Sequence, residues 1–302
     1  ILGEMEQDCV FSRETICQRI LAICKTYDID IICTQEDILL ETKNGIVPEY
    51  SPIYKTYGYE CVNYDIFQEN KSSTLKFVHT NTSIKIGNVI YVKSSLKPIA
   101  SPISTNMNSS PACMCQIQFK TINIANVHLC GGRFDDENVF LDSELLNTKL
   151  ESIKSITNTI VCGDFNATRG IGEPGGLKNM EYPNNIALKS GIDIKSSTIA
   201  EIWNTWQCSP IDFFYKNPNY FASFNDEQLK VVNETSKRGH YVVDWIFFNP
   251  YFIQKLDSHC ECMYEVEGMD NLSDHHMLLF TFSIKSDTTT RDQAISRYMY
   301  YI

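Results

Sequence analysis

The chain has 302 residues, of which 43% are hydrophobic and 21% are charged, and its formal net charge is −11. This composition predicts a folded protein with one large core or two modest domains, and it excludes long disordered stretches and an apolar run that could span a bilayer. An acidic field disfavours docking on nucleic acid, although a local basic groove can act within a Debye length. It also suits a protein that gathers carboxylates around a divalent cation.

Twelve cysteines are scattered along the chain, most of them inside apolar runs, as is typical of small buried hydrophobes in a reducing compartment. Two Cys-x-Cys pairs, Cys113/Cys115 and Cys260/Cys262, leave a structural zinc open, although they lack the Cys-x-x-Cys spacing. No basic leader precedes a hydrophobic segment at the start, so no signal peptide is predicted. We therefore expect an intracellular protein, cytoplasmic or nuclear, and a monomer.

The first predicted elements are a helix over Val10–Tyr27, with apolar residues at helical spacing, and a short apolar strand over Ile29–Cys33. Glu36 lies at the carboxyl end of this strand. Open α/β sheets bind ligands at the carboxyl ends of their strands, which makes Glu36 a candidate ligand. The alternative is a carboxylate that completes the dipole of a helical segment beginning there.

Short β runs separated by polar turns follow from Tyr59 onward. They are Tyr59–Tyr64, Leu75–His79, Ile84–Lys93, Cys113–Phe119 and Asn123–Leu129. The last run delivers His128 in front of a Gly-Gly turn, so His128 is a candidate phosphate contact. Arg133 in the following loop is a candidate substrate contact, and a surface ion pair with Asp135 or Asp136 is its alternative.

The clearest helical spacing covers Phe140–Ile156, and an apolar strand over Thr159–Cys162 comes next. After Gly163 this strand ends in Asp164 and Asn166, which alternate on one face. The carboxylate can orient or deprotonate a nucleophile, and the amide can donate a hydrogen bond to a phosphate oxygen. The alternative is a strand that runs into an Asx-rich turn.

The section from Ala167 to Glu227 has the glycines and prolines of irregular structure, with a helical turn predicted over Ile199–Trp206. Loops of this length usually carry specificity. Its many aromatic residues could stack on bases, but a local hydrophobic cluster is the favoured interpretation.

A strand predicted over Tyr241–Phe248 carries Asp244 in its middle. A carboxylate inside an apolar strand is costly unless it is partnered, and a histidine is the natural partner. A strand over Cys260–Glu265 follows, and His275 then stands just before the last predicted strand, Met277–Ile284.

Taken together, the polar residues at strand ends have the oxygen and imidazole chemistry of phosphate-ester cleavage. They are Glu36, His128, Asp164, Asn166, Asp244, Asp274 and His275. Glu36, with Asp274, would hold a hard divalent cation, Mg²⁺ or Mn²⁺. Asp244 hydrogen-bonded to His275 would fix the ring tautomer and raise its basicity.

In this arrangement Asp164 would orient or deprotonate the attacking water, while Asn166 and His128 hold the non-bridging oxygens. The imidazolium of His275 could neutralise charge on the transition state, or the neutral ring could take a proton. Positioning and charge neutralisation are most of what phosphoryl chemistry needs.

Five short pieces of the chain, in order, resemble the endonuclease/exonuclease/phosphatase superfamily with its DNase I-like fold. They are Gln35-Glu36, His128-Leu129, Gly163-Asp164-Phe165-Asn166, Val243-Asp244-Trp245-Ile246 and Ser273-Asp274-His275. The resemblance implies an α/β fold, a four-layer α/β/β/α sandwich of two mostly antiparallel sheets with the site at one rim. It also implies a metal-dependent phosphodiesterase with the residue roles given above.

The family opens with a strand that ends in a metal-site asparagine, and the sequence as given begins after that point. We expect this strand to lie upstream of residue 1. The rest forms a single domain over residues 1–284, followed by a tail over residues 285–302 that packs on the surface or binds a partner.

Within the superfamily, tyrosyl-DNA phosphodiesterases and deadenylase-type nucleases are the most similar branches. Trp203 or Trp206, and the aromatic loop before Asp244, favour processing of DNA ends, as in DNA repair, so nucleic acid is the expected substrate. One alternative is an inositol-phosphate or lipid phosphatase, or a sphingomyelinase-type phosphodiesterase, acting on small phosphoesters. Another is a non-catalytic binding module, which the intact motif positions disfavour.

Overall fold

A computed structural model describes most of the chain. It covers residues 13–66, 84–96, 113–119, 122–129, 159–189, 195–204, 208–232, 234–235, 241–253, 258–263, 275–284 and 295–301. The predicted strand Leu75–His79, the predicted helix Phe140–Ile156, and the candidate residues Arg133 and Asp274 lie outside these ranges. No helix within them is long and apolar enough to cross a membrane.

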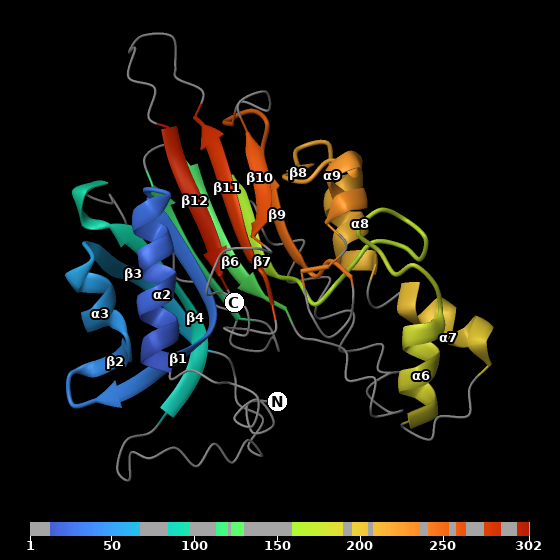
Figure 1. Cartoon of the computed structure of the whole chain (residues 1–302), viewed down its shortest axis with the longest axis horizontal. Coiled ribbons are helices and arrows are strands. Elements are labelled where there is room, and N and C mark those ends of the chain that lie inside the picture. The colour runs from blue at the N-terminus through green and yellow to red at the C-terminus, as the bar shows by residue number, and fades with distance from the viewer. Residues whose placement is uncertain are drawn as a thin grey trace.

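Two sheets form the centre of the molecule (Figure 1). The seven-stranded sheet has the order β10 (His259–Met263), β11 (Met277–Ser283), β12 (Ile295–Tyr301), β1 (Ile31–Thr42), β4 (Ile84–Lys93), β3 (Tyr59–Ile66), with β2 (Gly45–Pro48) on β1. The five-stranded sheet has the order β5 (Cys113–Phe119), β6 (Ile122–His128), β7 (Ile160–Asp164), β9 (Asp244–Phe248), β8 (Phe221–Ala222). All pairs are antiparallel except β1 with β12 and β6 with β7.

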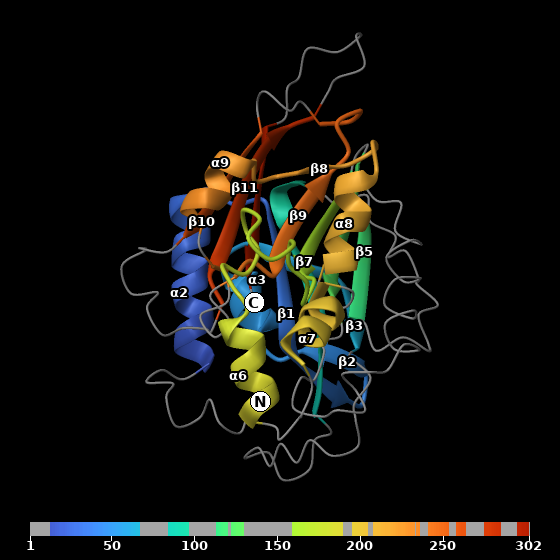
Figure 2. The same cartoon turned by 90° about the vertical axis from the view of Figure 1, so that its right-hand side faces the viewer.

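Helices lie outside the sheets (Figures 1 and 2). They are α2 (Arg13–Thr26), α3 (Ser51–Thr56), α6 (Glu181–Lys189), α7 (Ser196–Trp203), α8 (Ser209–Lys216) and α9 (Asp226–Val231), with a 3₁₀ turn at Ser94–Leu96. On α8, Phe214 stacks on Phe247 of β9 with ring centroids 4.5 Å apart, which fixes this helix against the five-stranded sheet.

Alternation along the strands builds the layers. In β1, Ile31 and Cys33 belong to the core between the sheets, while Ile32 packs with the apolar face of α2. In β11, Leu278 is in the inter-sheet core and Leu279 is on the helix side. A strand segment buried on both faces is apolar at consecutive positions, as are Ile31–Cys33 and Met277–Phe280. The predicted four-layer sandwich is therefore confirmed.

Several boundaries differ from the sequence-based expectation, and three of them change how the chain is interpreted. The strand predicted to end at Cys33 continues to Thr42 as β1, because a bulge lets the chain pass Glu36 without leaving the sheet. Glu36 is therefore not at a helix N-terminus. Asp244 is the first residue of β9 and not its middle, since the residues before it are held outside the ladder. The helix predicted over Ile199–Trp206 spans Ser196–Trp203.

Two segments are more regular than expected. The section from Ala167 to Glu227 contains α6, α7 and α8 together with the start of α9, so it is not mainly irregular. Part of the expected tail forms β12, which lies between β1 and β11, parallel to the first and antiparallel to the second. This segment therefore contributes to the interior of the seven-stranded sheet.

Candidate active site

Strand register places three of the candidate residues in one row. His128 at the end of β6 pairs with Asp164 at the end of β7, and Asp164 pairs with Asp244 at the start of β9. Neighbouring strands lie about 4.8 Å apart, so register alone brings these side chains within reach of one another. The row therefore crosses the sheet at the ends of three neighbouring strands, β6, β7 and β9.

Gly163 allows β7 to approach β6 at this point. Its φ is 150°, and a Cβ added there would stand 1.8 Å from the carbonyl oxygen of Val127. A side chain at this position would push the two strands apart, so glycine is required where Asp164 enters the row.

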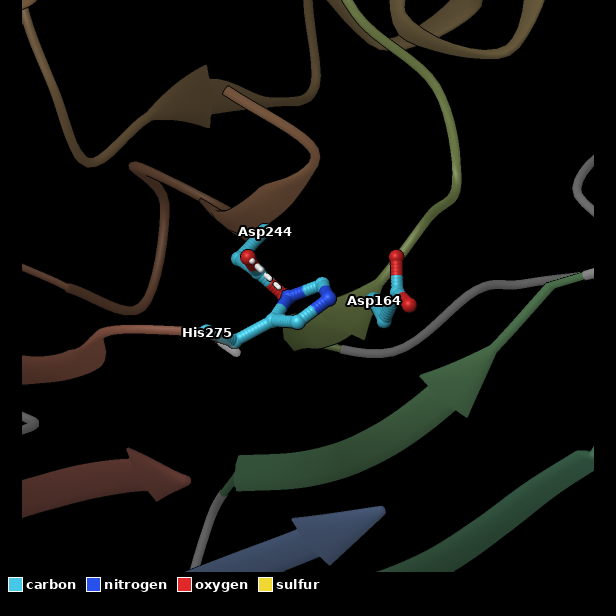
Figure 3. A group of neighbouring side chains, drawn as sticks. All are labelled: Asp164, Asp244 and His275. Carbon is cyan, nitrogen blue, oxygen red and sulfur yellow. Dashed lines mark hydrogen bonds and ion pairs between the residues drawn. The ribbon is translucent and has the colours of Figure 1, made fainter. Parts of the chain in front are cut away.

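Asp244 and His275 form the expected pair. Nδ1 of His275 lies 2.9 Å from Oδ2 of Asp244, and the ring lies between Asp244 and Asp164 (Figure 3). Asp244 is fully buried, and its Oδ1 has no hydrogen-bond partner among the described residues. The hydrogen bond fixes the imidazole tautomer with Nδ1 as the donor.

Thr235, which the sequence did not indicate, holds both members of this pair. Its Oγ1 accepts hydrogen bonds from the backbone N–H groups of Val243 and Asp244, each at 3.0 Å. Its carbonyl oxygen accepts from the N–H of His276 at 2.7 Å. The strand starts that carry the carboxylate and the imidazole are thus tied to one buried residue.

Asp164 has an unusual environment for a carboxylate. Burial, followed by the nearby charge of Asp244, raises its pKa from 3.8 to about 6, although His275, His128 and the N–H of Asn166 act in the opposite direction. The N–H of Asn166 donates to Oδ1 at 2.7 Å, and its Nδ2 donates to Oδ2 at 3.0 Å. Asp164 is therefore poised to exchange a proton near neutral pH.

Asn166 lies beside Asp164 at the end of the strand. Its position is compatible with both interpretations of the sequence, a catalytic role and an Asx turn. Its φ of 43° is left-handed, and its Nδ2 also donates to the carbonyl oxygen of Leu129 at 2.8 Å. Both amide hydrogens are thereby engaged within the protein. In this arrangement Asn166 orients the carboxylate of Asp164.

His128 links the row to Glu36 of the other sheet. Its Nε2 is 3.6 Å from Oδ2 of Asp164 and 4.0 Å from Oε1 of Glu36. The Glu36 side chain is 39% exposed, in contrast to the buried aspartates. Glu36 has a φ of 51° and occupies the bulge between Thr34 and Asp37 in β1.

The residues present fit a divalent cation. Ligand atoms of Asp164, Asp244 and His275 lie within 4.8 Å of one another. Two buried carboxylates so close together repel each other unless a proton or a cation offsets their charge, and Oδ1 of Asp244 lacks a partner among the described residues. Glu36 adds an accessible carboxylate beside His128. Oxygen donors of this kind suit Mg²⁺ or Mn²⁺.

The family that the chain matches indicates a hydrolase that acts on phosphoesters. The chain belongs to the Endonuclease/Exonuclease/phosphatase family, whose model matches residues 17–275. A comparison with curated proteins finds no match.

Solved structures with a similar course of the chain include an AP endonuclease from Archaeoglobus fulgidus, with 15% identity, a TM-score of 0.49, and coverage of 87% of this chain and 92% of that one. Another is the 3′ phosphatase NExo from Neisseria, solved with a product DNA hairpin. It has 11% identity and a TM-score of 0.48, and the match covers 91% of this chain and 96% of that one. A third is ANGEL2, a 2′,3′-cyclic phosphatase, with 19% identity, a TM-score of 0.43, and coverage of 86% of this chain and 83% of that one.

Proposed function

We propose that this protein is a divalent-metal-dependent phosphodiesterase that hydrolyses a phosphoester in nucleic acid by in-line attack of an activated water. The observation that carries the proposal is the row of His128, Asp164 and Asp244, completed by the Asp244–His275 hydrogen bond of 2.9 Å. A hydrolase of this class needs a base for water and a cationic group for the phosphate, and the row supplies both.

Asp164 is the group that activates water. Its pKa of about 6 leaves most of the carboxylate ionised at neutral pH while keeping it basic enough to take a proton. The two hydrogen bonds from Asn166 hold its oxygens in place. Asn166 thus supports the base, and the contact with a non-bridging phosphate oxygen that its sequence position predicts stays a prediction.

His275 stabilises the charge that develops on the phosphate. Its Nδ1–H points to Asp244, so the buried carboxylate favours the protonated ring. An imidazolium held in a fixed position offsets negative charge in the transition state without reorganising. His128 is a second contact for a non-bridging oxygen, since its Nε2 lies between Glu36 and Asp164.

Glu36, with Asp274, would hold the cation, Mg²⁺ or Mn²⁺. Such an ion neutralises phosphate charge and polarises the phosphorus–oxygen bonds. Glu36 reaches the site from the seven-stranded sheet and the water activator comes from the five-stranded sheet. The substrate would therefore lie across the rim where the two sheets meet, with Arg133 as a further contact.

Processing of nucleic acid ends, as in DNA repair, is favoured by Trp203 or Trp206 and by the aromatic segment before Asp244. A small phosphoester such as an inositol phosphate remains the second candidate, favoured by the net charge of −11, which disfavours a long polyanion. Buried thiols such as Cys17 and Cys208, whose pKa burial raises to about 12, suit a reducing compartment in the cytoplasm or nucleus.

A substrate panel tests the proposal. The protein would be incubated with Mg²⁺ and single-stranded DNA, abasic duplex, 5′-tyrosyl DNA, poly(A) RNA or inositol phosphates, with Asp164→Asn as the blank. Cleavage of an oligonucleotide that the blank does not show supports the assignment. Hydrolysis of inositol phosphates alone would transfer the protein to the second candidate, and no turnover on any substrate would refute catalysis.

A further inference from the structure

A polar bridge crosses the apolar space between the two sheets. Asn126 of β6 is fully buried, and its Nδ2 donates to the carbonyl oxygens of Thr34 at 2.9 Å and Val89 at 3.1 Å on the facing sheet. Its Oδ1 accepts a hydrogen bond from Nε2 of Gln35. All three partners lie on β1 or β4, so one side chain of the five-stranded sheet holds two strands of the other.

The bridge meets β1 at its bulge. Thr34 pairs with Val89 and Asp37 pairs with Gly87, so Gln35 and Glu36 together face the single residue between them on β4. A bulge interrupts the ladder and leaves backbone groups that need other partners. Asn126 supplies donors to the carbonyls of the last regular pair, Thr34 and Val89.

The bulge in turn sets the direction of Glu36. A left-handed φ of 51° is unfavourable for a non-glycine residue and persists only when the surroundings enforce it. Asn126 and His128 are two residues apart on β6 and face the same side. Asn126 holds Gln35, the residue before Glu36, through a hydrogen bond. His128 has its Nε2 4.0 Å from the carboxylate of Glu36.

We propose that Asn126 is a positioning residue that fixes the Glu36 carboxylate for the divalent cation through the β1 bulge. This proposal rests on the proposed function, because it takes Glu36 as a ligand of the cation. Without the bridge, β1 can relax toward a regular strand, which turns alternate side chains to the other face. Groups that orient metal ligands from behind typically change metal affinity by about 10-fold to 100-fold when removed.

The test measures binding of Mn²⁺ by electron paramagnetic resonance, with no substrate present, together with the melting temperature. Asn126→Ser should weaken Mn²⁺ binding by about 10-fold in the wild-type background. In a Glu36→Gln background the same substitution should change binding by less than about 2-fold, because the ligand it positions is already lost. Ile124→Val on the same face of β6 is the matched control, since it removes buried volume without touching the bridge.

If Asn126→Ser does not fold, Gln35→Met is the substitute variant. It removes the hydrogen bond from Gln35 to Asn126 and keeps the two that Asn126 Nδ2 donates, so Mn²⁺ binding should weaken by about 3-fold. Unchanged Mn²⁺ binding in a folded variant, or equal weakening in both backgrounds, would overturn the positioning role alone. Absence of Mn²⁺ binding by the wild type would instead refute the metal site, and the positioning role with it.

Discussion

The charge of Asp164 opposes folding at neutral pH, so Asp164→Asn should abolish activity and yet stabilise the protein. The carboxyl is almost fully buried beside Asp244, and its pKa is raised from 3.8 to about 6. An acid whose pKa is higher in the folded chain than in the unfolded chain favours folding when protonated. Its contribution is fully present below pH 3.8 and is lost as the pH rises through 6.

The magnitude follows from the two pKa values. At about 1.4 kcal/mol per pKa unit, ionisation of Asp164 lowers the free energy of unfolding by about 2 kcal/mol at pH 5 and by about 3 kcal/mol at pH 7.5. Asparagine removes this cost, but it cannot accept both hydrogen bonds from Asn166, which costs ~1 kcal/mol at either pH. The pH-dependent part is therefore on the order of 1 kcal/mol, or about 2 °C in melting temperature for a chain of this size.

Differential scanning fluorimetry in EDTA at pH 5 and pH 7.5 measures this difference without a bound cation. The melting temperature of Asp164→Asn minus that of the wild type should be about 2 °C more positive at pH 7.5 than at pH 5. Glu227→Gln, at an exposed carboxylate, is the control and should show no such change. Equal differences at both pH values, or turnover retained by Asp164→Asn, would refute the reasoning.

Three further predictions concern the site. His275→Ala should lower turnover by about 10²-fold to 10⁴-fold and should also lower the melting temperature, because the buried Asp244 loses its hydrogen-bond partner, whereas His259→Ala, at an exposed residue of β10, should leave turnover unchanged; equal activity of the two would reject the role of the ring. EDTA should abolish activity and Glu36→Gln should raise the Mg²⁺ concentration for half-maximal rate at least about 10-fold, and an EDTA-resistant wild type would contradict the metal assignment. Gly163→Ala should prevent soluble expression because its Cβ would overlap the Val127 carbonyl, while Gly172→Ala, with open space around it, should cost about 1 kcal/mol; comparable melting temperatures would refute the close approach.

The strands, the sandwich and the partner of Asp244 could be predicted from the sequence, because they depend on apolar periodicity and on one charged residue within an apolar strand. The run over Ile84–Lys93 matches β4, and the sandwich follows from strands buried on both faces. Asp244 was expected to need a histidine partner, because a carboxylate in an apolar strand is costly, and the hydrogen bond to His275 is present.

What the sequence could not show depends on contacts between distant segments. Nothing near Gln35 in the chain indicates that its partner is Asn126, 91 residues away on the other sheet. The left-handed conformations of Glu36 and Asn166 are equally hidden, since neither is a glycine. A weak signal did exist: a buried polar residue at Asn126, alternating with His128, indicates a paired polar group on the inner face.

The candidate active site is divided between two sheets whose interface is mainly apolar. Glu36 lies on the seven-stranded sheet and His275 stands two residues before β11 of the same sheet, whereas His128, Asp164 and Asp244 lie on the five-stranded sheet. Interdigitated apolar side chains resist sliding because interiors are close-packed. A small shear between the sheets would displace Glu36 and His275 relative to Asp164. The rate of hydrolysis should therefore fall before either sheet loses its hydrogen bonds between strands.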